Sequence, residues 1–459
     1  MTILPSIGRS GHPQFRFALL AAMVLVGNAL AASQAFASGR FEGVASCAGS
    51  TCHGRSEGDG KVVRQDELRT WQEPSSKSGA HSRAFAALAG PRGRRIAASL
   101  GYKSATTSPA CHGCHATPAP PVQRGARFQL SDGVGCESCH GAASGWLSSH
   151  YAVPASHAKN VAAGLTPLER PKVRASVCLD CHFGSDKPGQ FVTHAMMAAG
   201  HPRLSFELDL FSSLQQHYDL DRDYGARKGQ VDSVRMWAVG QAEAVRRSTA
   251  LFSRSAFSSE GIFPQFYFYD CHSCHRPISD GPQAKRTFET NPGRPIAFGQ
   301  PPFNDENIIM LSAVARVLAP GSAVRFDAAS REFHAAMGKG RGEAEAAASR
   351  LSQAAAALSS ELASRGYSAD TAFQVIAAIA NKTIAARFTD YAGSVQAVMA
   401  VDTLLNALVK QGRITIGAAA GIRANVNRAY SAVSSPERYD PPVFRAALGN
   451  ATSNIGALR

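Results

Sequence analysis

The feature that most constrains this sequence is a set of five cysteine pairs, each followed at once by a histidine. All ten cysteines belong to these pairs, and none is left over. Four of the pairs have the spacing C-x-x-C-H. The cysteines are Cys47, Cys52, Cys111, Cys114, Cys136, Cys139, Cys178, Cys181, Cys271 and Cys274. The histidines that follow them are His53, His115, His140, His182 and His275.

This spacing is the signature of covalent attachment of c-type heme. Two thiols add across the two vinyl groups of one heme, and the two-residue gap lets both sulfurs reach the same porphyrin edge. The adjacent histidine then ligates the iron from one face as the proximal ligand. The sequence therefore predicts heme c, with four attachment sites of standard spacing and a fifth at the first pair.

Two other uses of paired cysteines compete with this interpretation. Exported chains often oxidise their cysteines to disulfides, and C-x-x-C pairs often bind zinc. Neither use requires a histidine directly after every second cysteine. Both are therefore disfavoured for the set as a whole.

The first pair departs from the standard spacing. The segment Cys47-Ala-Gly-Ser-Thr-Cys52-His53 has four residues between the cysteines. Gly49 and its small neighbours let the longer loop bow outward while both sulfurs still reach one porphyrin. We expect heme attachment here too, with a Cys47–Cys52 disulfide as the alternative.

Each iron also needs a second axial ligand on its other face. Nine histidines remain after the five proximal ones and His12 of the N-terminal leader are set aside. His157 competes with His150, while His112 and His272 lie inside attachment loops and should point away from their own iron. His334 lies in a distant helical region and is expected to be a surface residue. The expected distal ligands are His81, His150, His194, His201 and His217.

One segment carries two of these expected ligands. In His194-Ala-Met-Met-Ala-Ala-Gly-His201-Pro202 the spacing of seven places both imidazoles on one helix face, about 10.5 Å apart along the axis. Pro202 disfavours the α conformation at His201, so the helix should end near Gly200. Methionine ligation is less favoured, and bis-histidine ligation predicts low reduction potentials.

The N-terminus is predicted to be a secretory signal. Arg9 and Arg16 precede an apolar run over 17–31, and Ala35-Phe-Ala37 is a typical cleavage site, with Ala29-Leu-Ala31 as a second possible site. The mature chain would begin at Ser38, in the periplasm or another exported location. An uncleaved anchor is the alternative, but the run is short for a membrane span, and no later segment is expected to cross a membrane.

The net charge of +14 suggests nucleic acid, an anionic membrane or an acidic partner. Bound hemes explain it better, because their propionates are ionised at neutral pH. Arg124, Arg127 and Arg203 are possible propionate partners, although each is individually more typical of a solvated surface. We expect redox partner proteins, no nucleic acid, no integral span after cleavage, and possible peripheral membrane association.

The composition changes along the chain. Residues 38–290 hold every cysteine and are loop-rich, residues 291–303 are rich in Pro and Gly, and residues 304–459 are Ala-rich and free of cysteine. Asn304 is a candidate N-cap for a helix that Pro320-Gly321 would stop. Amphipathic stretches follow near 342–364, 369–386, 391–411 and 415–434. The expected fold is mainly α, with a multiheme domain, a linker, and a helical bundle.

Three heme segments resemble one known family. The segments are Gly133-Val-Gly-Cys136-Glu-Ser-Cys139-His140-Gly141, the run from His194 to Glu207, and Tyr269-Asp-Cys271-His-Ser-Cys274-His275. With Trp237-Ala-Val-Gly-Gln241 they resemble the cytochrome c-554 / c-prime family of multiheme cytochromes over roughly residues 40–280. The resemblance implies a mostly helical fold organised by stacked hemes, an electron-transfer role, and His81, His194 and His201 as distal ligands.

Electron transfer through about five hemes is therefore the leading expectation. The alternative is a multiheme oxidoreductase that acts on a small nitrogen or sulfur compound at one open heme. An open heme needs an iron without a distal ligand, whereas the sequence offers more distal candidates than irons. Catalytic residues are accordingly not predicted, and whether the protein is an enzyme stays open.

Overall fold

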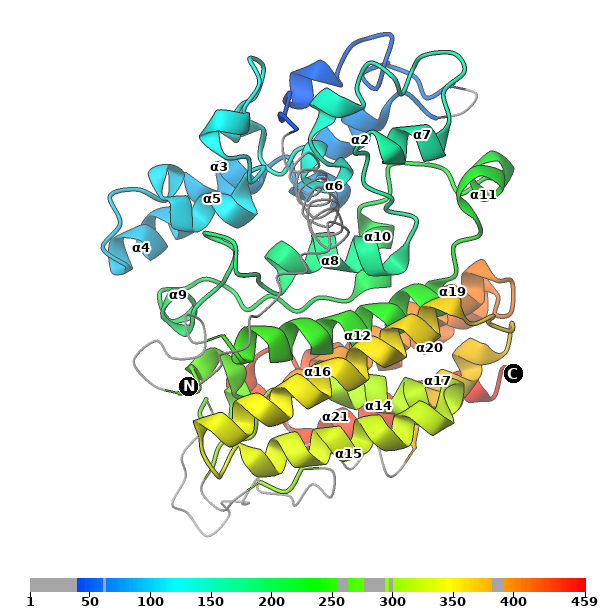
Figure 1. Cartoon of the computed structure of the whole chain (residues 1–459). Coiled ribbons are helices and arrows are strands. Elements are labelled where there is room, and N and C mark those ends of the chain that lie inside the picture. The colour runs from blue at the N-terminus through cyan, green and yellow to red at the C-terminus, as the bar shows by residue number, and fades with distance from the viewer. Residues whose placement is uncertain (1–38, 61–62, 255–262, 276–293, 297–299, 382–390) are drawn as a thin grey trace, which may run out of the picture.

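The computed structural model describes residues 39–60, 63–254, 263–275, 294–296, 300–381 and 391–459. The described chain is mainly helical, as predicted, and contains no β-strand beyond two isolated bridges, Phe41–Arg124 and Tyr269–Phe303. Long helices form a bundle on one side of the molecule, and short helices with long loops form the other side (Figure 1). The signal-peptide prediction falls outside the described residues.

The bundle is built around one continuous apolar core. Helices with apolar residues at intervals of three and four, such as Leu351, Leu358 and Leu362, bury that face completely. Ala-rich faces let the helix axes approach closely in the same core. The bundle helices are α12 (Ser233–Phe252), α14 (Glu306–Leu318), α15 (Pro320–Ala336), α16 (Arg341–Ser364), α17 (Thr371–Ala380), α19 (Tyr391–Lys410), α20 (Ile416–Ala432) and α21 (Pro441–Gly456).

The four predicted amphipathic stretches correspond to α16, α17, α19 and α20, with residues 382–386 outside the described part. The expected helix stop at Pro320-Gly321 is confirmed, because α14 ends at Leu318, but Pro320 also occupies the first turn of a new helix, α15. Proline is well tolerated at that position, where its missing N–H has no helical partner to lose. The sequence reading missed α15 and α21, and both begin with proline. Asp305, not Asn304, precedes α14.

Helix α12 belongs by sequence to the predicted heme domain but packs in the bundle. It lies in the stretch predicted to be the heme domain, 38–290, yet Trp237 and Phe252 are fully buried in the bundle core. Phe303, from the predicted linker, joins the same core. The bundle core therefore extends into residues on both sides of the predicted border, and the division into domains stays a prediction.

In the other half of the molecule the described residues form short helices and two small apolar clusters, one around Leu179 and one around Leu88. Its α-helices are four to twelve residues long, as expected for a region where side chains alone do not form the core. They are α2 (Glu67–Gln72), α3 (Ala84–Leu88), α4 (Pro91–Ser99), α5 (Pro109–His115), α6 (Glu137–His140), α7 (His157–Ala162), α8 (Pro171–His182), α9 (His194–Ala198), α10 (Leu208–Leu214) and α11 (Arg222–Lys228).

By length and composition alone, α19 could cross a membrane, contrary to the expectation that no later segment could. Most of this helix is buried inside the bundle, where Gln396 and Thr403 hydrogen-bond to Phe206 and Glu207 of the other half. A buried apolar helix of a bundle core passes the same compositional test. The packing of α19 matches that second description.

Candidate functional site

Five pairs of histidines face each other across the half of the molecule that carries the cysteines. Each pair joins one histidine of an attachment motif to one of the five predicted distal histidines. The ring centres lie 6.0 to 6.3 Å apart in all five. The pairs are His53–His150, His182–His81, His115–His201, His140–His217 and His275–His194.

This separation suits two imidazoles on opposite faces of one metal. With a metal–nitrogen bond of about 2.0–2.1 Å and a ring centre about 1.1 Å beyond the nitrogen, the two centres would lie about 6.3 Å apart. Direct stacking of aromatic rings is often closer, at about 4.5 Å. The space between each pair thus fits an intervening iron.

The outer nitrogen of several paired histidines is held by a hydrogen bond. The Nδ1 atom of His53 lies 2.9 Å from Glu67 Oε2, that of His115 lies 2.8 Å from the Ala84 carbonyl, and that of His217 lies 2.9 Å from the Gln215 carbonyl. His150 and His201 make the same kind of bond to nearby carbonyls. Such bonds fix the tautomer and ring orientation of a metal-binding histidine and leave Nε2 for the metal.

The four remaining histidines pair with no motif histidine. His112 uses its Nε2 atom on the Thr106 carbonyl at 2.9 Å, and the Nε2 atom of His157 lies 3.1 Å from Glu169. His272 bonds the Pro436 carbonyl through Nδ1. His334 was expected to be a surface residue, but it is buried in α15 close to Asp305. Because the helix packs its polar side against Asp305, the periodicity of the region did not reveal this burial.

The two histidines of the 194–201 segment do not share a helix, contrary to expectation. Helix α9 ends at Ala198, and Gly200 adopts a positive φ of 107° that closes the helix C-terminus. His201 follows this turn and reaches His115, while His194, at the start of α9, reaches His275. The physical cause is the one anticipated, since Pro202 disfavours helix at His201, but the helix ends earlier.

All ten cysteines are described, and none forms a disulfide. Thiols of different motifs instead lie against one another. A hydrogen bond between Cys47 and Cys136 raises the pKa of Cys47. Burial raises the pKa of Cys178 to about 12, and the nearby Cys139 thiol adds to the rise. The first, third and fourth attachment segments therefore adjoin in that order.

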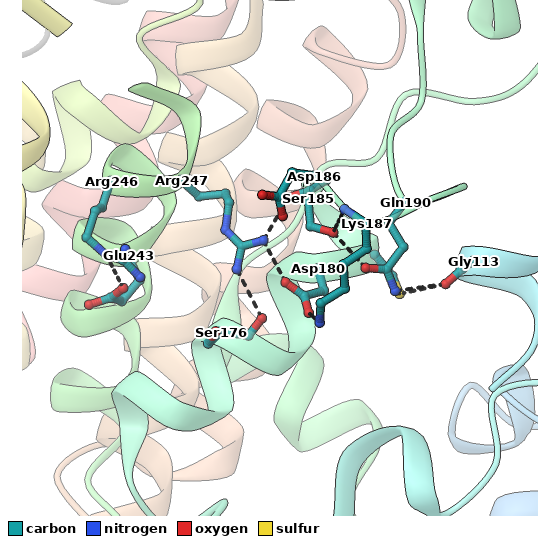
Figure 2. Close-up of polar contacts among 12 residues, drawn as sticks. Gly113, Ser176, Asp180, Ser185, Asp186, Lys187, Gln190, Glu243, Arg246 and Arg247 are labelled. Carbon is teal, nitrogen blue, oxygen red and sulfur yellow. Dashed lines mark hydrogen bonds and ion pairs between the residues drawn. The ribbon is translucent and has the colours of Figure 1, made fainter. Parts of the chain in front are cut away.

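The second attachment segment adjoins the fourth. The Cys181 Sγ atom lies 3.5 Å from the Gly113 carbonyl, and Gln190 Nε2 donates to the same carbonyl at 3.0 Å (Figure 2). Gly113 has no room for a side chain, because a Cβ there would lie 2.5 Å from the backbone of Gly189. Close backbone packing thus holds these two motifs together.

The longer loop of the first motif brings its histidine to the same place as the others. The His53 N–H donates to the Cys47 carbonyl at 3.2 Å, as His140 does to Cys136 at 2.9 Å and His275 to Cys271 at 2.8 Å. The extra residues form a turn in which Cys52 N–H donates to the Gly49 carbonyl. The local backbone therefore accommodates two additional residues without moving the histidine away from its partner.

Helix α12 clamps the fourth attachment segment to the bundle. Arg247 Nη1 donates to Asp180 Oδ1 at 2.6 Å and to the Gly184 carbonyl at 3.0 Å, and Arg247 Nη2 reaches the Ser176 carbonyl (Figure 2). Asp180 lies between the two cysteines of that motif. The pair is largely buried, so the attachment segment is tied to a rigid helix.

Side chains near the histidine pairs are aromatic or buried. Phe206 stacks on His182 with ring centres 4.9 Å apart, and Phe266 lies 5.3 Å from His194. Phe268 belongs to the bundle core, so the aromatic segment Phe266-Tyr-Phe-Tyr269 both contacts a histidine pair and fills the core. Arg203 is buried, with Nη1 2.9 Å from Cys271 Sγ and Nη2 3.3 Å from Glu306.

These features suit heme rather than a bare metal ion. No cluster of three or more metal-binding side chains occurs in the described part of the chain, and a porphyrin supplies the four equatorial ligands that the pairs lack. Burial and the neighbouring His217 lower the pKa of His140 to about 3, and burial and His81 lower that of His182 to about 4. Both rings are therefore neutral, the form that ligates iron.

Sequence reasoning missed the residues that support these pairs. Glu67, Arg247 and Gln190 each contact a motif or its histidine but lie in no recognisable motif, and Phe206 lies in the segment 194–207 without having been singled out. Their role depends on contacts between segments far apart in the chain. No local pattern could have identified them.

The comparisons with known proteins agree with the motif geometry. Residues 46–141 match the family described as cytochrome c554 and c-prime. The matched segment includes the first three attachment motifs and three of the paired motif histidines. No curated protein and no solved structure matches the chain.

Proposed function

From the premise that the chain is a c-type cytochrome with an electron-transfer role, we propose that it is a pentaheme carrier whose five irons each take two histidines. The observation that carries this proposal is the set of five histidine pairs at a nearly constant 6.0–6.3 Å. Each pair contains one motif histidine, and each motif is used once.

Heme c supplies a reversible one-electron couple at a fixed, covalently held position. The residues of this chain would set the spacing and surroundings of that couple. The ten cysteines would hold the hemes covalently, the paired imidazoles would ligate the irons, and Glu67 and backbone carbonyls orient the imidazole rings. Buried aromatic rings such as Phe206 exclude water from one pair.

The contacts between attachment segments support a single continuous series. The first segment adjoins the third through Cys47 and Cys136, and the third adjoins the fourth through Cys139 and Cys178. The fourth adjoins the second through Cys181. The segment 194–201 links the second pair to the fifth, since it supplies a histidine to each.

Both ends of this proposed series reach the surface. Cys52 of the first motif and Cys274 of the fifth are exposed, whereas the other eight cysteines are partly covered. A carrier must exchange electrons with partners at its surface, and exposed terminal sites serve that purpose. The series would therefore run from one exposed site to another through covered ones.

The pairing favours a carrier over the oxidoreductase alternative. An enzyme acting on a small nitrogen or sulfur compound needs an iron with an open position. In the described residues, every motif histidine faces a second histidine at the same distance. No observation on this chain favours an open site.

Export to the periplasm is part of the proposal. Its support is the leader sequence ending near Ala37 and the attachment chemistry, which takes place after export. Cysteines in an oxidising compartment would form disulfides unless another bond consumed them. Thioether bonds to heme would consume all ten.

Coulometric reduction of the purified holoprotein with optical and EPR detection tests this function. The proposal predicts about five electrons taken up per chain and ferric hemes that are all low-spin. A high-spin ferric signal, or rapid binding of nitric oxide or cyanide by the resting protein, would favour the oxidoreductase. Uptake of four electrons or fewer per chain would contradict the presence of a fifth heme.

A further inference from the structure

One segment of the cytochrome region is strongly basic. Between Glu73 and Asp132 the sequence has eight basic side chains and no acidic one. This stretch includes the second attachment motif and helices α3 to α5. The basic residues are Lys77, Arg83, Arg92, Arg94, Arg95, Lys103, Arg124 and Arg127.

Helix α4 presents three of these charges directly to solvent. Gly93 and Ala97 form its buried face, while Arg92, Arg94 and Arg95 are exposed. The helix lies at the outer edge of the cytochrome region, away from the bundle (Figure 1). Its arginines therefore face outward from a peripheral position.

The buried face of the same helix packs onto the second attachment site. Ala97 forms a small apolar cluster with Leu88 and Ala105, and Cys111 packs against that cluster. The charged surface and the second site are thus separated by little more than the thickness of one helix.

Acidic side chains do not neutralise this surface. Arg83 and Arg124 donate to backbone carbonyls, and Arg94 donates to the Ala89 carbonyl. In the parts of the chain that the structure describes, no ion pair involves Arg92, Arg95 or Lys103. The positive charge of the exposed face is therefore available to a partner.

We propose that the arginine face of α4 docks an acidic redox partner protein and brings it to the second attachment site. The proposal rests on the electron-transfer function and adds a third exchange surface between the two exposed ends. Complementary charge steers such encounters and speeds association. Arginine is suited to this role because its planar fork binds carboxylates with two hydrogen bonds.

The surface fits a protein better than a membrane. A helix that lies on a bilayer needs a broad apolar face toward the lipid. Val122, outside α4, is the one large exposed apolar side chain of residues 74–131, and α4 itself exposes no apolar side chain larger than Pro91 and Ala98. A face of arginines without large apolar neighbours is more typical of a charge-steered protein contact.

The experiment uses the holoprotein and a reduced flavodoxin as a small acidic probe protein. Affinity for oxidised flavodoxin and the second-order rate of reduction by reduced flavodoxin are measured at low and high salt. The test variant is R92E/R95E, and the matched control is R325E/R331E, which reverses two exposed arginines of α15 in the bundle. Reduction by photoreduced lumiflavin, a small uncharged donor, normalises for any change in the hemes.

The wild-type protein should bind flavodoxin at low salt and lose that affinity at high salt. R92E/R95E should bind and react about tenfold or more weakly at low salt, with a flatter salt dependence, while the control keeps at least half of the wild-type values. Equal loss in both variants, or no binding by the wild type, would overturn the proposal. So would arginine-dependent binding to phosphatidylglycerol vesicles without binding to flavodoxin.

The two proposals can fail separately. A chain that holds no reducible heme fails the lumiflavin reaction in every variant, which contradicts the proposed function. A chain that reacts normally with lumiflavin but shows no preference between the two double variants contradicts only the docking surface.

Discussion

The imidazole rings of His53 and His150 lie 6.2 Å apart and within 12° of parallel, although one follows the first attachment motif and the other follows the third. Replacement of His150 by alanine should leave one iron with a single protein ligand. The ferric protein should then show a high-spin signal from about one heme in five, detected by EPR.

The matched control for that prediction is H157A. His157 is the neighbouring histidine that competed for the same role, but it contacts Glu169 and no motif histidine. This variant should keep the fully low-spin spectrum. A high-spin signal in H157A with none in H150A would reverse the assignment.

Glu67 should lower the reduction potential of the site that His53 serves. Its carboxylate accepts a hydrogen bond from His53 Nδ1 at 2.9 Å and makes the imidazole a stronger electron donor to ferric iron. E67Q should therefore raise the potential of one heme by roughly 40 mV, which corresponds to about 1 kcal/mol for one electron. A spectroelectrochemical titration measures the shift.

E57Q is a suitable control for the loss of one negative charge in the same segment. Glu57 is exposed and lies between the first motif and α2. Its replacement should shift no single potential by more than about 10 mV, because exposed charges are screened by solvent and salt. Equal shifts in the two variants would show that the hydrogen bond to His53 has no special effect.

Arg247 should stabilise the contact between the bundle and the fourth attachment segment. R247Q removes a buried charge-assisted bond to Asp180 and should cost about 2–3 kcal/mol in the free energy of unfolding. Denaturant unfolding followed at the Soret band measures the loss. R350Q, which breaks the exposed pair with Glu332, should cost less than about 0.5 kcal/mol. Equal costs would contradict the clamp.

The angles between paired imidazoles should produce two kinds of ferric EPR signal. The His53–His150 and His194–His275 planes are 12° and 35° apart, whereas the His115–His201 and His140–His217 planes are 86° and 85° apart. Perpendicular ligand planes leave two iron d orbitals nearly equal in energy and give strongly anisotropic spectra, while near-parallel planes give rhombic ones. A spectrum with only one kind of signal would contradict this arrangement.

Local sequence patterns predicted some helices of the bundle and missed others. Helices α16, α19 and α20 could be predicted because their apolar residues recur at helical spacing over several turns. Helix α15 was missed because Pro320 was interpreted only as the stop of the preceding helix, and α21 was not predicted at all. The burial of α12 in the bundle could not be predicted, since the sequence shows that a helix is amphipathic but not which element covers it.

In the candidate site, too, some residues could be predicted from local patterns and others could not. The attachment motifs are local, so their ten cysteines and five histidines are visible in the sequence. The pairing of His81 with His182, or of His217 with His140, joins segments that are distant in the chain, and only the fold brings them together. The end of α9 before His201 followed from a local rule about Pro202, yet its consequence, two separate partners, depended on tertiary structure.

The central claim is that five hemes are joined covalently to the five cysteine pairs, and the intact mass of the mature holoprotein tests it most directly. The measured mass should equal that of the mature chain plus five hemes, with no thiol left to react with an alkylating reagent under denaturing conditions. A mass with four additions and a free or disulfide-bonded Cys47 and Cys52 would contradict attachment at the first pair. A mass with no additions would contradict the account as a whole.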